Sequence, residues 1–372
     1  MNQSFLKKTF FYFFLFVFLL IATSPAFAQR TRALMVGEEF PNILIEQKLS
    51  SSDLKYLGLS KKAKFRFKEI KGELILLEML NVYCPNCQNQ APILTNLHEA
   101  IEKDPATKGK IKMIGIAAGN NEREIQTFKK RYNISYPIIP DIKFKILDVV
   151  GSSRAPFHIL IRKSPDEMVI AKAHFGLIKE YSPYLEDART IMTYKIATIK
   201  KTKKEGPPEP LKPLKPDISE EKLISLVKQG LKEVGNEIIE FKEIKLKNNE
   251  IVYMGSMSKK NEGEKLFAKV ASRTAICDAC ENTHFIFVFD SKGKVVNLVP
   301  LALTKYGNVK WNEEDLKKMK NRVLGKYLYN PFDFDSRVDA VSQATITSVL
   351  VFDSLERADT IYQELKEKGY LN

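Results

Sequence analysis

The feature that most constrains this chain is an apolar run, followed closely by two cysteines and then by a helical repeat. Leu74–Leu80 is almost wholly apolar. Cys84-Pro-Asn-Cys87 follows after three intervening residues, and apolar residues then recur at helical spacing through Ile101. This order predicts a buried strand, a Cys-x-x-Cys turn and a helix. Unpaired N–H groups at a helix N-terminus stabilise a thiolate, the form that attacks disulfides. We therefore expect Cys84 to be reactive, with a lowered pKa.

Residues 1–28 have the pattern of a secretory signal peptide. Lys7 and Lys8 are basic, Phe10–Ala22 is apolar, and Ala26-Phe-Ala28 is a small-x-small cleavage pattern. The apolar run is shorter than the roughly 20 residues of a membrane span. We expect cleavage there and a periplasmic or secreted mature chain, where disulfides persist. An uncleaved membrane anchor is the alternative.

The formal net charge of +14 comes from lysines scattered along the whole chain. No dense basic block interleaved with aromatic residues is present, so we do not expect a nucleic-acid partner. Association with an anionic membrane surface stays open, because scattered positive charge attracts lipid headgroups weakly.

The length suggests two domains, and a proline-rich segment separates them. Residues 201–217 contain Gly206-Pro-Pro-Glu-Pro210 and two later prolines, which favours an extended polyproline II spacer. We predict a first domain at residues 33–200, a linker at 201–217 and a second domain at 218–372.

The first domain alternates strands and helices, which predicts an α/β fold with a central sheet flanked by helices. The expected strands are 43–46, 74–80, 111–117, 157–161 and 168–175, and the expected helices are 85–101, 121–132, 144–150 and 181–199.

The second domain has an α+β pattern with an antiparallel sheet. The expected helices are 219–234 and 345–366, and the expected strands are 238–246, 251–257, 265–272, 284–290 and 295–299. The last two strands are joined by Asp290-Ser-Lys-Gly293, which is a hairpin signal.

Two residues outside the first dithiol fit the same chemistry. Glu78 lies in the apolar strand six residues before Cys84, so we expect its carboxylate behind the dithiol, where it would exchange a proton with the second thiol. A solvated carboxylate at a sheet edge is the alternative. Pro156 introduces a strand, and a cis bond there would leave the neighbouring backbone free to pair with a substrate peptide.

These residues resemble the thioredoxin superfamily, most of all the extracytoplasmic thioredoxin-like reductases of cytochrome maturation and envelope disulfide chemistry. The resemblance spans about residues 35–195 and rests on Cys84-Pro-Asn-Cys87, Glu78, the segment 111–117 and Pro156. It implies that Cys84 is the nucleophile and that Cys87 resolves the mixed disulfide. The implied partners are envelope protein thiols or disulfides, or a membrane electron donor.

Two departures from the family pattern bear on substrate choice. Tyr83 replaces the usual Trp before the first cysteine, and Ala155 replaces the frequent Thr or Val before the proline. A peroxiredoxin is disfavoured, because the Pro-x-x-x-Thr/Ser-x-x-Cys context is absent.

The segment before the last expected helix resembles the flavinylation motif of the FMN-binding domain family. Asp339-Ala-Val-Ser342-Gln-Ala-Thr345 is similar to Asp-x-x-Ser/Thr-Gly-Ala-Thr/Ser, within a resemblance over about residues 250–350. It implies an FMN site at Asp339, Ser342 and Thr345, with the phosphoester on Thr345. Gln343 stands where the family has Gly, which permits close approach and positive φ. A flavin-free domain in which Ser342 caps a helix is the alternative.

Cys277-Asp-Ala-Cys280 is the second Cys-x-x-Cys pair, and the two pairs account for all four cysteines. A c-type haem would require His in place of Glu281. Zinc would find Cys277, Cys280 and His284, one ligand short of a closed site. We prefer a second redox dithiol and expect no metal, while a structural disulfide and a metal site stay open.

The sequence as a whole predicts an exported thiol–disulfide oxidoreductase with redox-active disulfides, passing electrons between Cys84/Cys87, Cys277/Cys280 and a flavin. The alternative is a non-catalytic docking protein, with structural or metal-holding cysteines and a flavin-free second domain.

Overall fold

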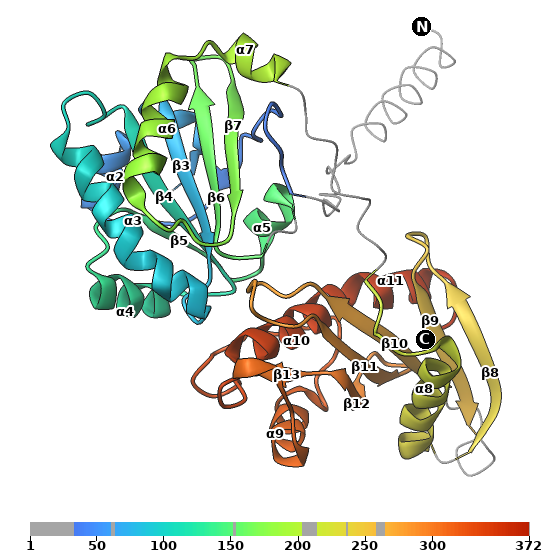
Figure 1. The fold of residues 1–372 in the computed structure, drawn as a ribbon. Coiled ribbons are helices and arrows are strands. Elements are labelled where there is room, and N and C mark those ends of the chain that lie inside the picture. Colours follow the sequence, from blue (N-terminus) through green and yellow to red (C-terminus); the bar gives the residue numbers. More distant parts are fainter. Residues whose placement is uncertain are drawn as a thin grey trace, which may run out of the picture.

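The computed structural model describes residues 33–60, 64–151, 154–202, 214–235, 237–257 and 265–371. They form two domains, each built around a five-stranded sheet (Figure 1). The predicted signal at 1–28 and positions 203–213 of the predicted linker lie outside the described residues.

The first domain has a mixed sheet with the strand order β5-β4-β3-β6-β7. Strand β3 pairs in parallel with β4 and antiparallel with β6. All seven residues of β3 are buried, as expected for a strand with both sheet faces covered. The strands are β3 (Leu74–Leu80), β4 (Ile111–Ala118), β5 (Ile138–Asp141), β6 (Phe157–Lys163) and β7 (Met168–Phe175).

Helices cover both faces of this sheet. On one face, Leu76 and Leu80 belong to the same core as α3, α4 and α6. On the other, Ile75 and Leu77 pack in a core with α2 and α5. Period-two alternation along β3 therefore supplies both cores. The helices are α2 (Ser51–Leu57), α3 (Pro85–Lys103), α4 (Glu122–Tyr132), α5 (Lys145–Val150) and α6 (Tyr181–Thr193).

The prediction of a single helix at 181–199 is wrong. Tyr194 has extended backbone angles and its N–H bonds the carbonyl of Ile191, which ends α6 in a tight turn. A separate short helix, α7 (Ile196–Lys201), follows.

The second domain has an antiparallel sheet in the order β12-β11-β10-β9-β8, as the strand pattern predicted. One face packs on α8 (Glu220–Gly235), and the other packs on α9 (Glu313–Val323), α10 (Thr345–Arg357) and α11 (Asp359–Glu367). The strands are β8 (Ile238–Lys245), β9 (Ile251–Met257), β10 (Lys265–Arg273), β11 (Thr283–Asp290) and β12 (Val295–Ala302).

Two helical assignments in this domain differ from the expectation. The helix expected at 345–366 is divided at Ala358 into α10 (Thr345–Arg357) and α11 (Asp359–Glu367). Helix α9 (Glu313–Val323) was not predicted, because it is strongly charged and buries little beyond Met319 and Val323.

The two domains pack directly against each other. Ile276 and Cys277, on the loop between β10 and β11, belong to the hydrophobic core of the first domain, as does Val349 of α10. The ion pairs Lys143–Glu356 and Asp148–Arg357, both 2.7 Å long, also cross the boundary.

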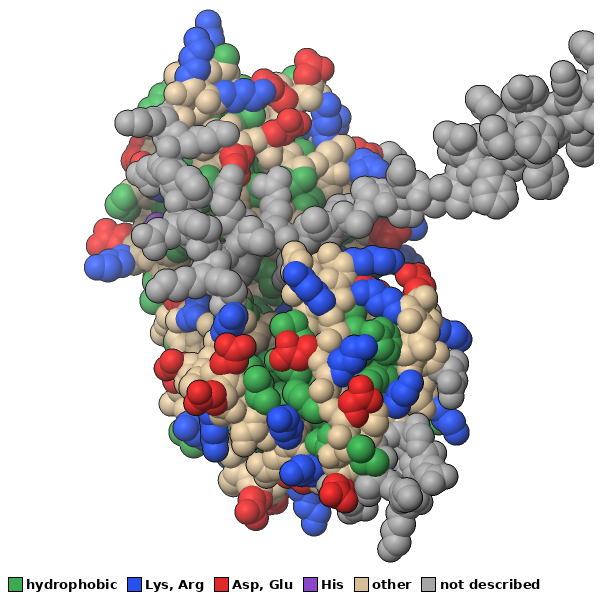
Figure 2. Space-filling view, turned by 90° about the vertical axis from the view of Figure 1, so that its right-hand side faces the viewer, with side chains coloured by type: hydrophobic (Ala, Val, Ile, Leu, Met, Phe, Trp, Pro, Cys, Tyr) green, Lys and Arg blue, Asp and Glu red, His purple; other side chains and the backbone are tan. Residues whose placement is uncertain are grey.

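The described surface carries its positive charge in scattered positions. On the face in Figure 2, Lys and Arg side chains alternate with Asp and Glu. Within the described ranges, no helix has the length and apolar composition needed to cross a bilayer.

Candidate active site at two facing Cys-x-x-Cys pairs

The turn from β3 to α3 positions the first dithiol. Cys84 is the N-cap of α3, and Pro85 takes the first helical position. Proline has no backbone N–H, and at this position the helix does not require one. Cys84 and Cys87 both have 0% of their surface exposed. The first dithiol is therefore shielded from solvent in this arrangement of the domains.

Glu78 is buried within β3, so the alternative of a solvated carboxylate at a sheet edge does not apply. Tyr136 Oη donates a hydrogen bond of 3.0 Å to its carboxylate. Burial raises the pKa of Glu78 to about 7. Burial also raises the pKa of the Cys87 thiol, and the charge on Glu78 adds to that rise. A charged Glu78 therefore opposes formation of the Cys87 thiolate.

The Ala155–Pro156 peptide bond is cis, and the loop between β10 and β11 pairs with the backbone beside it. Ala155 N–H donates to the carbonyl of Ile276 at 2.5 Å, and Asp278 N–H donates to the carbonyl of Ala155 at 3.0 Å. These two bonds form a parallel bridge between Ala155 and Cys277. The second Cys-x-x-Cys of the chain therefore occupies the position predicted for a substrate peptide.

This pairing brings one thiol of each motif together. The sulfurs of Cys84 and Cys277 and a carboxylate oxygen of Asp278 all lie within 4.8 Å of one another. Cys277 is fully buried, whereas Cys280 is partly exposed. The four described cysteines are free thiols in this structure. Cys84 therefore faces Cys277, while Cys87 lies on its inner side and Cys280 on the outer side.

The pKa values of the two facing thiols move in opposite directions. Thiol hydrogen bonds from Cys280 and Cys84, together with backbone N–H groups, lower the pKa of Cys277. Contact with Cys277 raises the pKa of Cys84, and Cys87 and burial add to that rise. While the domains are docked, contact with Cys277 therefore opposes the lowered pKa that the helix N-terminus predicts for Cys84.

The chain matches no family model, but part of it is similar to known thiol–disulfide oxidoreductases. It is 26% identical over 157 residues to the thiol-disulfide oxidoreductase ResA of Halalkalibacterium halodurans, covering 42% of this chain and 77% of the relative. It is 24% identical over 139 residues to ResA of Bacillus cereus, covering 37% and 69%. The first domain is a thioredoxin-like thiol–disulfide oxidoreductase domain.

Solved structures show partial likenesses of similar extent. StoA from Bacillus subtilis is 16% identical and has a TM-score of 0.30, covering 40% of this chain and 98% of its own. A DsbF homologue from Corynebacterium diphtheriae is also 16% identical, with a TM-score of 0.31 and coverages of 45% and 97%. These comparisons do not support the FMN-binding resemblance of the second domain.

Polar residues that the sequence analysis did not single out join the thioredoxin-like domain to the second motif. Asn86 Nδ2 donates to both carboxylate oxygens of Asp278 at 2.9 Å. Arg154 donates to the Cys280 carbonyl at 3.1 Å and to Asn282 Oδ1 at 3.0 Å. Asn86 and Asp278 stand inside the two motifs, so their positions were visible, but nothing in the sequence indicated that the motifs meet.

The zinc set considered from sequence is not assembled. His284 Nδ1 lies 2.8 Å from Ser272 Oγ within the sheet, and among the described residues the ligand-like cluster is Cys84, Cys277 and Asp278 instead. Both oxygens of Asp278 already accept the amide of Asn86. This arrangement suits exchange between two thiols better than a closed metal site.

The predicted flavin segment is divided between two environments. Gln343 and Thr345 line a cavity of about 550 Å³ that also contacts Cys280 and Tyr83. Asp339 is not among the lining residues and accepts a hydrogen bond from Asp335 N–H. Ser342 is exposed and does not line the cavity either.

Gln343 adopts the backbone conformation for which the family has glycine. Its φ of +59° lies in the left-handed region, and its side chain is exposed. The replacement therefore keeps the local chain path, at the cost of placing a Cβ in a conformation that glycine adopts without strain.

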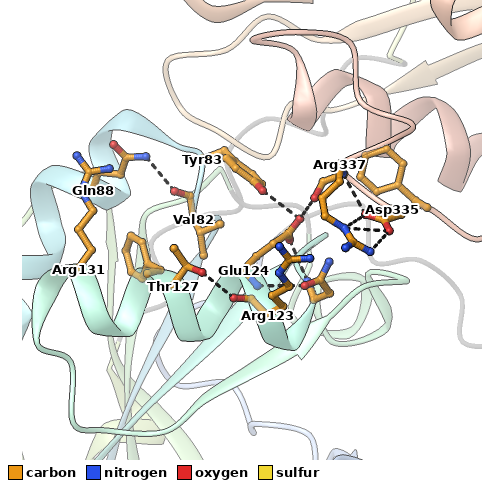
Figure 3. A pocket seen from close by; sticks show the side chains of 13 residues that line it. Val82, Tyr83, Gln88, Arg123, Glu124, Thr127, Arg131, Asp335 and Arg337 are labelled. Atoms are coloured by element: carbon orange, nitrogen blue, oxygen red, sulfur yellow. Dashed lines mark hydrogen bonds and ion pairs between the residues drawn. The ribbon is translucent and has the colours of Figure 1, made fainter.

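Tyr83 separates this cavity from a second one, of about 580 Å³. Figure 3 shows its ring pointing towards Glu124, to which Tyr83 Oη donates at 3.0 Å. Ser336 of the second domain donates to the same carboxylate oxygen. Tyr83 is thus held at the domain boundary beside the first cysteine.

Proposed function

We propose that this thiol–disulfide oxidoreductase is exported and that it transfers electrons between its own two dithiols, Cys84/Cys87 and Cys277/Cys280. The observation that carries the proposal is the placement of Cys277 against Cys84, through the backbone bridge at Ala155. A partner held in position reacts at a high effective concentration, which favours exchange within the chain over exchange between molecules.

The exchange is balanced without any further reactant. Starting from a Cys277–Cys280 disulfide, the Cys84 thiolate attacks Cys277, so that a Cys84–Cys277 bond forms and Cys280 leaves as a thiolate. The Cys87 thiolate then attacks Cys84, forming Cys84–Cys87 and releasing Cys277. Two electrons and two protons pass from the first pair to the second, and the reverse reaction follows the same steps.

Glu78 would assist the second step, in which Cys87 attacks Cys84. Cys87 must lose its proton before it attacks Cys84, and its raised pKa opposes that loss. A buried carboxyl group with a pKa of about 7 is matched to accepting and returning this proton near neutral pH.

The test is to trap the bond between the domains. A Cys87→Ser/Cys280→Ser chain retains only the two facing thiols, and mild oxidation should convert it to a Cys84–Cys277 disulfide. Peptide mass mapping identifies the linked cysteines. The matched control, Cys84→Ser/Cys280→Ser, should form far less of its Cys87–Cys277 bond. Equal yields in both chains, or linkage only between molecules, would overturn the proposal.

A flavin is the second candidate, and one observation favours it. Thr345 and Cys280 line the same cavity, and residues 345–347 precede Ser348, whose N–H makes the first helical bond of α10. Amide groups at such a helix start favour a phosphate. We propose that Thr345 and the free N–H groups of residues 345–347 would hold the phosphate end of FMN, which would supply a two-electron carrier beside the second dithiol.

We propose a location outside the cytoplasm on the basis of the signal-like pattern at residues 1–28. The partners would be protein thiols or disulfides of the cell envelope, or a membrane electron donor.

A further inference from the structure

The four sulfurs differ in their access to solvent. Cys84, Cys87 and Cys277 each have 0% of their surface exposed, and Cys280 is partly exposed. The loop that carries Cys277 covers Cys84 by pairing with Ala155, the backbone that the sequence analysis assigned to a substrate peptide. An external partner therefore meets the second dithiol first while the domains are docked.

Cys280 opens into a cavity rather than onto a flat surface. The cavity has a volume of about 550 Å³ and lies between the two domains. Its walls include Tyr83, Pro85, Tyr306 and Ile346. Tyr306 is 67% exposed and Tyr83 is 36% exposed, so both present aromatic rings to an incoming group. Exposed aromatic rings beside a reactive atom favour an apolar neighbour on the ligand.

We propose that Cys280 is the external port of the protein, and that it reacts with a cysteine on an extended peptide segment carrying an apolar or aromatic residue next to that cysteine. This inference rests on the proposed exchange between the two dithiols and adds the order in which the sulfurs react. We choose an extended segment because Cys280 lines a cavity, which a single chain can enter.

The external reaction uses the same chemistry. Contact with Cys277 and burial raise the pKa of the Cys280 thiol, so its proton leaves as the sulfur attacks a partner disulfide R–S–S–R′. A Cys280–S–S–R bond forms, and R′S⁻ leaves and takes up that proton. The Cys277 thiolate attacks Cys280, forming Cys277–Cys280 and releasing RS⁻. Two electrons pass to the partner, and the two thiol protons pass to the released thiolates.

Two matched chains test the order of reaction. Cys84→Ser/Cys87→Ser keeps only the second pair, and Cys277→Ser/Cys280→Ser keeps only the first. Each reduced chain is mixed with a peptide disulfide that has Phe beside the cysteine, then quenched with acid, and the released thiol is measured over time. The second pair should react at least ten-fold faster than the first. Equal rates, or a faster first pair, would overturn the port assignment.

A third variant separates loss of docking from intrinsic reactivity. Arg154→Ala, added to the Cys277→Ser/Cys280→Ser chain, removes the hydrogen bonds to the Cys280 carbonyl and Asn282. It should speed reaction of Cys84 with the peptide, because the covering loop is held less firmly. An unchanged slow rate would mean that Cys84 is slow for a reason other than the covering loop, and the port assignment would be wrong.

The preference for a peptide is tested by comparing a peptide disulfide with glutathione disulfide. The chain with only the second pair should react several-fold faster with the Phe-containing peptide disulfide than with glutathione disulfide, and Tyr306→Ser should remove most of that difference. If glutathione disulfide reacts as fast, the port takes small disulfides and the peptide assignment is wrong. These rates do not depend on the Cys84–Cys277 bond, so failure of the port and failure of the internal exchange are told apart.

Discussion

Asn86 donates its side-chain amide to both carboxylate oxygens of Asp278 at 2.9 Å, so a residue between the cysteines of one motif binds a residue between the cysteines of the other. This contact holds the two Cys-x-x-Cys turns beside each other. Together with the backbone bridge at Ala155, it directs Cys84 towards Cys277 rather than Cys280.

The first prediction concerns this contact. Asn86→Ala and Asp278→Ala should each slow formation of the Cys84–Cys277 disulfide by about ten-fold, since a hydrogen bond to a charged group contributes on the order of 1.5–3 kcal/mol. The double variant should be little slower than either single one, because both remove the same bond. Trapping rates in the Cys87→Ser/Cys280→Ser chain provide the measurement. Additive losses would show that the two residues act independently.

The second prediction concerns Glu78 and the pH dependence of exchange. Burial raises its pKa to about 7, so the carboxylate becomes available as a base as the pH rises through that value. Glu78→Gln should slow exchange near neutral pH and remove an inflection near pH 7 from the pH–rate profile. Circular dichroism should show an intact fold. Profiles of the same shape for both chains would mean that Glu78 takes no part in proton transfer.

The raised pKa of Glu78 also predicts how the stability of the fold changes with pH. Its folded pKa lies above the ordinary value of 4.5, so the unfolded chain loses this proton at a lower pH than the folded chain. The Glu78 contribution to stability is therefore lost as the pH rises from about 4.5 to 7, by up to about 1.4 kcal/mol per pH unit. Glu78→Gln should flatten this part of the stability curve in urea unfolding. A steeper curve in the variant would contradict the assignment.

The sequence predicted the parts of this site that depend on local pattern. Strand β3 was predicted with its observed bounds, Cys84 at the start of a helix was expected, and Glu78 lies buried as proposed. Each follows from residues within one or two turns of the motif. The pairing of Ala155 with Cys277 could not be predicted, because it joins positions 122 residues apart through a contact between domains.

The expected pKa of Cys84 depends on the contact with Cys277, which the sequence did not predict. Its position at the N-terminus of α3 favours a thiolate, and that part of the argument is local. The neighbouring Cys277 opposes this effect, because contact with it raises the pKa of the Cys84 thiol. The expectation for Cys84 came from the first motif alone. It therefore applies to the first domain without Cys277 against it.

A third prediction concerns His158, which pairs with His174 across neighbouring strands. It is fully buried, and neither of its ring nitrogens has a hydrogen-bond partner. Burial lowers its pKa from 6.5 to about 3, so below about pH 6.5 the unfolded chain binds a proton that the folded chain does not. Stability should therefore fall as the pH falls from about 6.5 towards 3.

His158→Phe removes this titration while keeping a ring in the core. Its free energy of unfolding should change less between pH 6.5 and 4 than that of the unaltered chain, by on the order of 2 kcal/mol. Chemical denaturation at several pH values measures the difference. His174→Phe is the matched control, because that ring is only partly buried, and its curve should stay close to the original. Parallel curves for His158→Phe and the original chain would show that another group causes the acid sensitivity.

The last prediction concerns the flavin segment. Gln343 has a φ of +59°, and a residue other than glycine in that region carries a strain of about 1 kcal/mol. Gln343→Gly should therefore stabilise the second domain slightly and ease the approach of a phosphate to Thr345. In the presence of a flavin transferase and FAD, we expect little FMN on the unaltered chain, more on Gln343→Gly, and none on Gln343→Gly/Thr345→Val. Intact-mass measurement decides between these outcomes, because covalent FMN adds a discrete mass. If Gln343→Gly gains stability but no mass, while a control domain is modified, the cavity beside Cys280 serves the peptide partner alone.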